Sequence, residues 1–150
     1  MGNNIIKNQF ALQYMFGGKS EFVIENIITH NRFLYQIKQA QNNKNLYFVY
    51  AKQITTDMDE ISKKNYSGYF IFNNGYYNYR KGKHGHLDVK DKPIMALTYT
   101  INRLKMSKLQ SCVHIKHTGR CGICGRRLTD DASVERGFGI SCYNKYIMQK

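Results

Sequence analysis

Three of the four cysteines lie near the end of the chain, in a segment rich in glycine and arginine. Cys121 and Cys124 form a C-x2-C pair, and Cys142 follows further along. Zinc in structural sites is usually held by thiolates and imidazoles in a tetrahedron. The C-x2-C spacing lets one tight turn aim two sulfurs at the ion, and Gly122 and Gly125 suit such a turn. The pattern therefore predicts a zinc (Zn2+) site with these three cysteines as ligands.

Three thiolates leave one position of the tetrahedron for a further ligand. His117 precedes Cys121 by four residues, and Gly119 offers a bend between them, so we expect His117 to be the fourth ligand. Cys112 is the main alternative, although its SCVHI context equally suits a strand with a buried thiol. His114 is another. Buried core thiols without metal are common, but the CGIC stretch is too polar and too rich in glycine for a core strand.

Two short helices are expected to complete this unit. Thr129 is predicted to cap the first helix, and Gly137 to end it. Ser141 is predicted to cap the last helix, which would carry Cys142 in its first turn. A cysteine knuckle followed by a ligand at the start of a helix is a treble-clef-like layout. Residues 111–150 are thus expected to form a small zinc-binding unit.

The preceding residues have the pattern of an antiparallel β-sheet. Strands are predicted at 10–16, 21–28, 32–38 and 46–54 and on both sides of Asn74-Gly75, a strong hairpin signal. Apolar residues at helical spacing predict an amphipathic helix over 93–107 that packs on the sheet. The predicted fold class is α+β. Residues 1–110 would form an antiparallel β domain of five or six strands with one helix, separate from the zinc-binding unit.

The chain carries a large excess of positive charge. It has 23 Lys and Arg against 10 Asp and Glu, a formal net charge of +13. Such an excess predicts an anionic partner, DNA or RNA, although A/T-rich coding would also raise the lysine count. The stretch YFIFNNGYYNYRKGKHGH places tyrosines beside cations, and Tyr69, Tyr76, Tyr77 and Tyr79 could offer stacking faces. Candidate nucleic-acid contacts are Tyr77, Tyr79, Arg80, Lys81, Lys83, Arg120, Arg126, Arg127 and Arg136.

Alternation along the hairpin leaves open which of these tyrosines face solvent and which face the core. Some of the arginines around the cysteines are also expected to offset the negative charge of a thiolate-rich zinc site. His84 and His86 lie in a basic loop, where solvated side chains are the usual case, and their role is left open.

The cysteine segment resembles an uncharacterised family of small proteins and domains from phages and bacteria. The family signature is H-x-G-R-C-x-x-C-G-R-x-L-T-x-x-x-S-x-x-x-G-x-G-x-x-C. The chain matches it at His117, Gly119, Arg120, Cys121, Cys124, Gly125, Arg126, Leu128, Thr129, Ser133, Gly137, Gly139 and Cys142. The resemblance implies a phage or prophage origin and a zinc-finger-like end, but no particular activity. A second partner class follows from that origin: a host protein such as a nuclease or defence complex.

Other classes of function have less support. No run of 18 apolar residues predicts a membrane span, and the start MGNNIIKNQF does not resemble a secretory signal. The protein is expected in the bacterial host cytoplasm, where thiols stay reduced and a metal is a better interpretation than disulfides. The stretch FGGKS lacks the first glycine of a phosphate-binding loop, since Gln13 stands there. With no catalytic constellation, the chain is not expected to be an enzyme or to take a small-molecule substrate.

Overall fold

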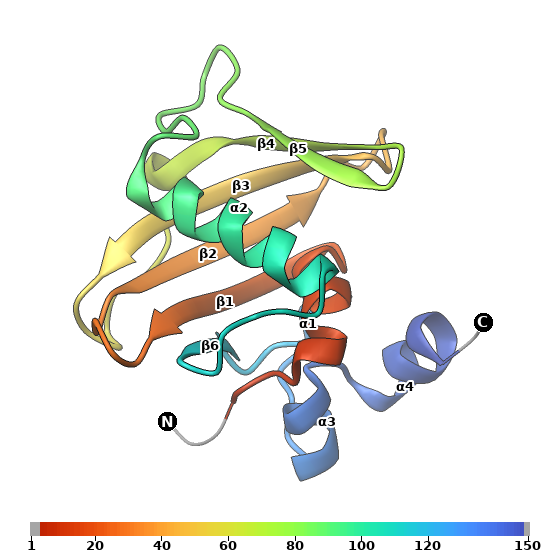
Figure 1. The fold of residues 1–150 in the computed structure, drawn as a ribbon. Coiled ribbons are helices and arrows are strands. Elements are labelled where there is room, and N and C mark those ends of the chain that lie inside the picture. Colours follow the sequence, from red (N-terminus) through yellow and green to blue (C-terminus); the bar gives the residue numbers. More distant parts are fainter. Residues whose placement is uncertain (1–3, 149–150) are drawn as a thin grey trace.

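The computed structural model describes residues 4–148 and is built around one antiparallel sheet. Six strands lie in the order β5-β4-β3-β2-β1-β6 (Figure 1). They are β1 (Lys19–Asn26), β2 (Arg32–Gln39), β3 (Leu46–Ile54), β4 (Tyr66–Asn73), β5 (Tyr76–Arg80) and β6 (Val113–His117). The first five pair in the order in which they follow one another in the chain and so form a meander. Together with the helices, the sheet confirms the α+β fold class.

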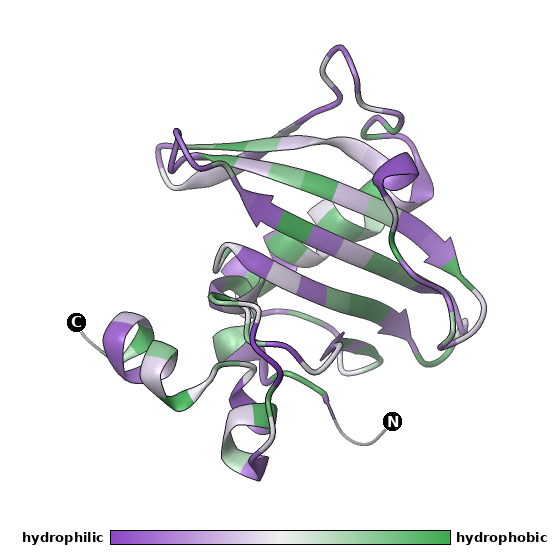
Figure 2. Ribbon diagram, turned by 180° about the vertical axis from the view of Figure 1, so that it is seen from behind, coloured by the Kyte–Doolittle hydropathy of each residue, from purple (hydrophilic) through white to green (hydrophobic). Residues whose placement is uncertain are grey.

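The helices gather on one side of the sheet and at one end of it. They are α1 (Asn8–Met15), the 3₁₀ turn η1 (Lys63–Asn65), α2 (Lys92–Lys105), α3 (Asp131–Arg136), α4 (Ile140–Cys142) and the π-helical turn η2 (Tyr143–Ile147). Helix α2 lies across one sheet face (Figure 1), whereas no α-helix of residues 4–148 lies across the opposite face (Figure 2). None of the helices between residues 4 and 148 has the length and apolarity needed to cross a membrane.

Helix α2 confirms the amphipathic pattern. Ile94, Leu97, Ile101 and Leu104 are buried against the sheet. This spacing of three and four residues puts them on one side of the helix. The helix begins with a proline near its first position, which is favourable because that residue needs no backbone donor there.

The prediction of a strand over 10–16 is wrong, because α1 occupies most of this range. Ala11, Tyr14 and Met15 are buried, and their spacing is that of one helical face, while Gln9 and Gln13 are exposed. A short run rich in apolar residues does not by itself distinguish a strand from a buried helix. Tertiary packing decided the outcome here.

The C-terminal segment is part of the same body as the sheet. Strand β6 pairs with β1 from Phe22↔His117 to Asn26↔Val113, so a boundary at residue 110 would cut a strand away from its sheet. The buried core is also continuous: Cys121 and Phe138 belong to the same cluster as the core residues of the sheet, α1 and α2. The C-terminal segment thus shares a strand pairing and a buried cluster with the sheet, and the division into two units stays a prediction.

Candidate metal centre

Cys121 and Cys124 lie in a tight backbone hairpin. The amide of Cys121 donates to the carbonyl of Arg126 over 2.8 Å, and the amide of Gly125 donates back to the carbonyl of Cys121 over 3.0 Å. Gly125 has a φ of 78°, a left-handed conformation that glycine adopts without strain. The amide of Ile123 lies 3.4 Å from the Cys121 sulfur. The predicted knuckle is present, with backbone donors directed at a sulfur.

Cys142 is brought to this knuckle by α3 and α4. Helix α3 begins after Asp130, whose carboxylate accepts from the amide of Ser133 over 3.0 Å, so the cap is one residue later than the predicted Thr129. Gly137 ends the helix with a φ of 86°, as predicted. Cys142 then lies in α4, in the first turn of the final helical segment.

The three sulfurs meet at one point. The Sγ atoms of Cys121, Cys124 and Cys142 all lie within 4.8 Å of one another. A tetrahedral ion with bonds of about 2.3 Å holds its sulfurs roughly 3.8 Å apart, close to this spacing. Cys121 is buried and Cys124 is exposed, so the cluster lies at the edge of the core. These three cysteines could hold a metal ion.

The surroundings of the sulfurs act on their pKa values in opposite directions. Burial raises the pKa of Cys121, but hydrogen bonds from the backbone at Cys124, Gly139 and Ile123 outweigh it, and the pKa is lowered. Burial, followed by the neighbouring thiols, raises the pKa of Cys142 to about 12. Three thiolates this close repel one another, and a bound cation would remove that repulsion.

His117, the predicted fourth ligand, is not in this group. Its Nδ1 accepts from the amide of Gly119 over 2.9 Å, so its Nε2 carries the proton and donates to the carbonyl of Val134. Burial lowers its pKa and so favours the neutral ring, against the opposing effect of the Val134 hydrogen bond. Both ring nitrogens are occupied by backbone groups. The geometry therefore does not support His117 as a ligand; instead, the ring joins the end of β6 to α3.

Neither alternative ligand belongs to the group of close thiols, which among residues 4–148 consists of Cys121, Cys124 and Cys142. Cys112 immediately precedes β6, whereas His117 ends it. At about 3.3 Å per residue, a strand of this length separates its two ends by more than 10 Å. His114 lies near the Cys112 end, opposite Glu25 of β1.

Tyr14 and three glycines attach the knuckle to the rest of the molecule, a role the sequence did not indicate. The Tyr14 ring packs so closely on Gly122 and Gly137 that a Cβ there would lie 2.6 and 2.8 Å from ring carbons. A Cβ on Gly17 would lie 2.6 Å from the carbonyl oxygen of Gly122. A glycine at each of these positions is compatible with a close contact. The sequence does not say which residue makes that contact; the fold does.

The predicted nucleic-acid contacts fall into two groups. Arg80, Lys81, Lys83, Arg120, Arg126 and Arg127 are exposed. Of these, Arg120 also donates to the carbonyl of Gly125 over 3.2 Å and so supports the knuckle. Arg136 is partly buried and lies over the ring of Tyr143, with 4.4 Å between its Cζ and the ring centroid. Arg136 is thus engaged within the protein.

Tyr77 and Tyr79 face the helix side of the sheet, contrary to their predicted role as stacking surfaces. Tyr77 stacks on Phe16 with 3.6 Å between ring centroids and an interplanar angle of 10°. The Tyr79 hydroxyl donates to the carbonyl of Leu87 over 2.8 Å. Their register opposite Phe72 and Phe70 places them on the packed face, so neither offers a free ring.

Comparison with known protein families shows a match in the C-terminal segment. A model for a family of unknown function, DUF6011, matches residues 114–147. This span contains the three clustered thiols and the helices that carry Cys142, and it agrees with the resemblance of this segment to an uncharacterised family. No curated protein and no solved structure matches the chain.

Proposed function

We propose that Cys121, Cys124 and Cys142 hold a structural zinc ion and that the protein binds nucleic acid through its basic surface. The observation that carries the zinc proposal is the convergence of three sulfurs within 4.8 Å. Thiolate ligands favour zinc over hard cations such as magnesium or calcium. The ion would cross-link the hairpin of Cys121 and Cys124 to Cys142 in α4. A cysteine hairpin joined through zinc to the start of a helix is a treble-clef-like layout.

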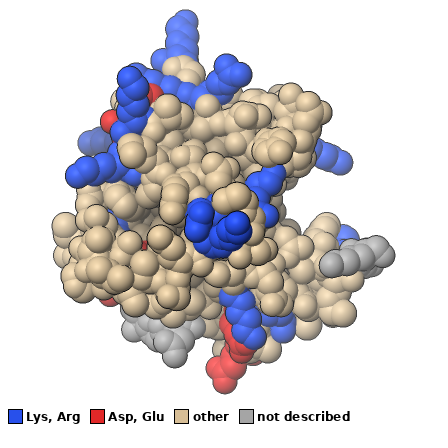
Figure 3. All heavy atoms as spheres, in the orientation of Figure 1, with Lys and Arg blue, Asp and Glu red and all other residues tan. Residues whose placement is uncertain are grey.

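Unbalanced charge supports the second part of the proposal. The net charge is +13, yet the ion pairs among residues 4–148 are only Lys7–Glu135, Arg32–Asp57 and Lys116–Glu25. Figure 3 displays the α2 side, where few acidic side chains accompany Lys and Arg. Most cations are therefore free to meet the phosphates of an anionic polymer.

The zinc half is tested by metal analysis of the reduced protein, and the nucleic-acid half by salt dependence. Binding of labelled single-stranded and duplex oligonucleotides would be followed by fluorescence anisotropy at several salt concentrations. Each neutralised phosphate contributes about −0.7 to the logarithmic salt slope on single strands and about −0.9 on duplex DNA. Absence of binding at low salt would overturn the nucleic-acid proposal. A partner retained from host lysate after nuclease treatment would then favour a protein target.

A further inference from the structure

The sheet face opposite α2 carries four side chains in direct register across four strands. Lys38 of β2 pairs with Phe48 of β3, Phe48 pairs with Tyr69 of β4, and Tyr69 pairs with Arg80 of β5. Neighbouring strands are about 4.8 Å apart, so two aromatic residues on adjacent strands lie between two cations. Figure 2 views this face, which no α-helix of the described part of the chain crosses.

Two further tyrosines extend the aromatic surface along the strands. Tyr50 lies beside Tyr66 with 5.4 Å between ring centroids, and the Lys38 ammonium is 5.6 Å from the centroid of Tyr50. The register between β3 and β4 shifts at Val49/Tyr50, and this bulge turns Tyr66 to the open face, because alternation alone would put it on the packed side. We call Phe48, Tyr50, Tyr66 and Tyr69 the aromatic patch; all four are half-buried.

The loop that contains Gly82, Lys83 and His84 borders the aromatic patch at one edge. Gly82 has a φ of 70° and lies so close to Tyr69 that a Cβ would be 2.7 Å from the ring. The Nδ1 of His86 lies 2.8 Å from the carbonyl oxygen of Tyr66 and anchors the loop. Lys83 and His84, together with the patch, line a cavity of about 610 Å³. This volume is within the usual range of about 300–1,000 Å³ for small-molecule-sized sites.

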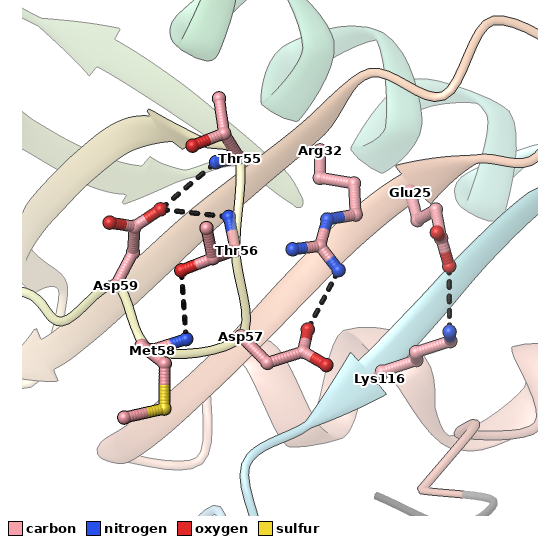
Figure 4. A network of polar contacts seen from close by, with 8 residues as sticks. All are labelled: Glu25, Arg32, Thr55, Thr56, Asp57, Met58, Asp59 and Lys116. Atoms are coloured by element: carbon pink, nitrogen blue, oxygen red, sulfur yellow. Dashed lines mark hydrogen bonds and ion pairs between the residues drawn. The ribbon is translucent and has the colours of Figure 1, made fainter.

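Charge on the open face is balanced at one end and unbalanced at the other. Near β1 and β6, Lys116 pairs with Glu25 at 2.6 Å and Arg32 pairs with Asp57 at 2.7 Å (Figure 4). Around the aromatic patch, by contrast, Lys38, Arg80 and Lys83 take part in no ion pair with any residue from 4 to 148. The patch is therefore the part of this face that complements an anion.

We infer that the aromatic patch is a stacking platform for the bases of single-stranded nucleic acid, with Lys38, Arg80 and Lys83 contacting its phosphates. The inference rests on the proposed nucleic-acid binding and adds the surface and the class of strand. Flat rings flanked by cations fit a polymer that alternates π-faces with negative charges. A duplex keeps its base faces stacked internally, so the platform discriminates against it.

The direct test is anisotropy with a labelled single-stranded oligonucleotide at low salt. Phe48→Ala and Tyr69→Ala are expected to weaken binding by roughly five- to 100-fold, the usual effect of losing a base–aromatic stack. Tyr69→Phe retains the ring and should bind within about twofold of the wild type. The matched control is Tyr99→Ala, which removes a tyrosine beside a cation on the α2 side of the molecule. Tyr99 is 49% exposed, and the Arg103 Cζ lies 5.8 Å from its ring centroid. This substitution should leave the affinity for the oligonucleotide unchanged.

A second measurement needs no variant. Photocrosslinking of wild-type protein with an oligonucleotide carrying 5-iodouracil, followed by peptide mapping, should label peptides of β3 and β4. Three results would overturn the platform while leaving nucleic-acid binding intact. The crosslinks could be confined to residues 120–136, or the folded Phe48→Ala and Tyr69→Ala variants could bind with unchanged affinity. The third such result is a preference for duplex over single strands. Binding of neither single strand nor duplex would overturn both proposals.

Discussion

The hydroxyl of Tyr14 donates to the carbonyl oxygen of Arg120 over 2.9 Å, although the two residues are 106 positions apart in sequence. Arg120 immediately precedes the first cysteine of the knuckle, and the Tyr14 ring is fully buried. The Tyr14 side chain is therefore one of the contacts that connect the thiol cluster to the rest of the molecule. Loss of this contact should lower the stability of both the thiol cluster and the sheet.

Tyr14→Phe removes this hydroxyl and keeps the ring. We expect the free energy of unfolding to fall by about 1–2 kcal/mol, because a partly buried carbonyl loses its donor. Urea denaturation followed by circular dichroism measures the change. Tyr99→Phe is the control, since an exposed hydroxyl should contribute less than about 0.5 kcal/mol. Equal free energies of unfolding for Tyr14→Phe and the wild type would show that the hydrogen bond from Tyr14 to Arg120 does not contribute to stability.

Gly122→Ala tests the close contact between the knuckle and α1. A Cβ at Gly122 would lie 2.6 Å from a Tyr14 ring carbon, so we expect a loss of about 1–3 kcal/mol from overpacking. Gly139→Ala is the matched control, because no atom of residues 4–148 lies within 4 Å of its Cβ position and its φ is −64°. Thermal unfolding of the two variants should separate them clearly. A tolerated Gly122→Ala would contradict the packing described here.

His117→Gln distinguishes a structural role from a metal-binding one. The ring is occupied by Gly119 and Val134, so we expect zinc content to be unchanged while stability falls by about 1–3 kcal/mol. Metal content is measured by mass spectrometry of the purified variant under reducing conditions. Loss of zinc from a folded His117→Gln protein would restore this residue as the fourth ligand.

The same histidine should make stability depend on pH. Burial lowers its pKa in the folded state, whereas the unfolded chain takes up a proton near pH 6.5, its ordinary value. The unfolded state thus binds more protons between the two pKa values, and stability falls as pH decreases through that interval. Unfolding free energies of the wild type and His117→Gln should converge on acidification from about pH 7.5 to 5.5. A constant difference would rule this effect out.

Much of the fold could be predicted from local sequence. Asn74 and Gly75 have φ values of 52° and 83°, the conformation that makes Asn-Gly a hairpin signal. The spacing of apolar residues identified α2. The strand predicted over 10–16 failed because a short apolar run is compatible with both structures, and only its packing against the knuckle selects a helix.

The thiol cluster could be predicted because cysteine spacing constrains which sulfurs can meet. The other parts of the site depend on tertiary structure. Proximity in sequence suggested His117 as a ligand, but its ring is occupied by the backbone amide of Gly119, two residues on, and by the backbone carbonyl of Val134 in α3. The direction of Tyr77 and Tyr79 depends on which sheet face α2 covers. The direction of the Tyr66 side chain depends on a β-bulge, which no sequence pattern predicted.

Native mass spectrometry of the reduced protein, purified with zinc supplied, tests the metal centre most directly. The wild type and Cys112→Ser should each carry a single zinc ion, because Cys112 lies outside the cluster, whereas Cys142→Ser should carry none. Removal of the ion from the wild type should lower the stability of the whole chain in one transition, since Cys121 belongs to the common core. A wild-type chain without zinc, or a Cys142→Ser chain that keeps it, would contradict the assignment of these three thiols.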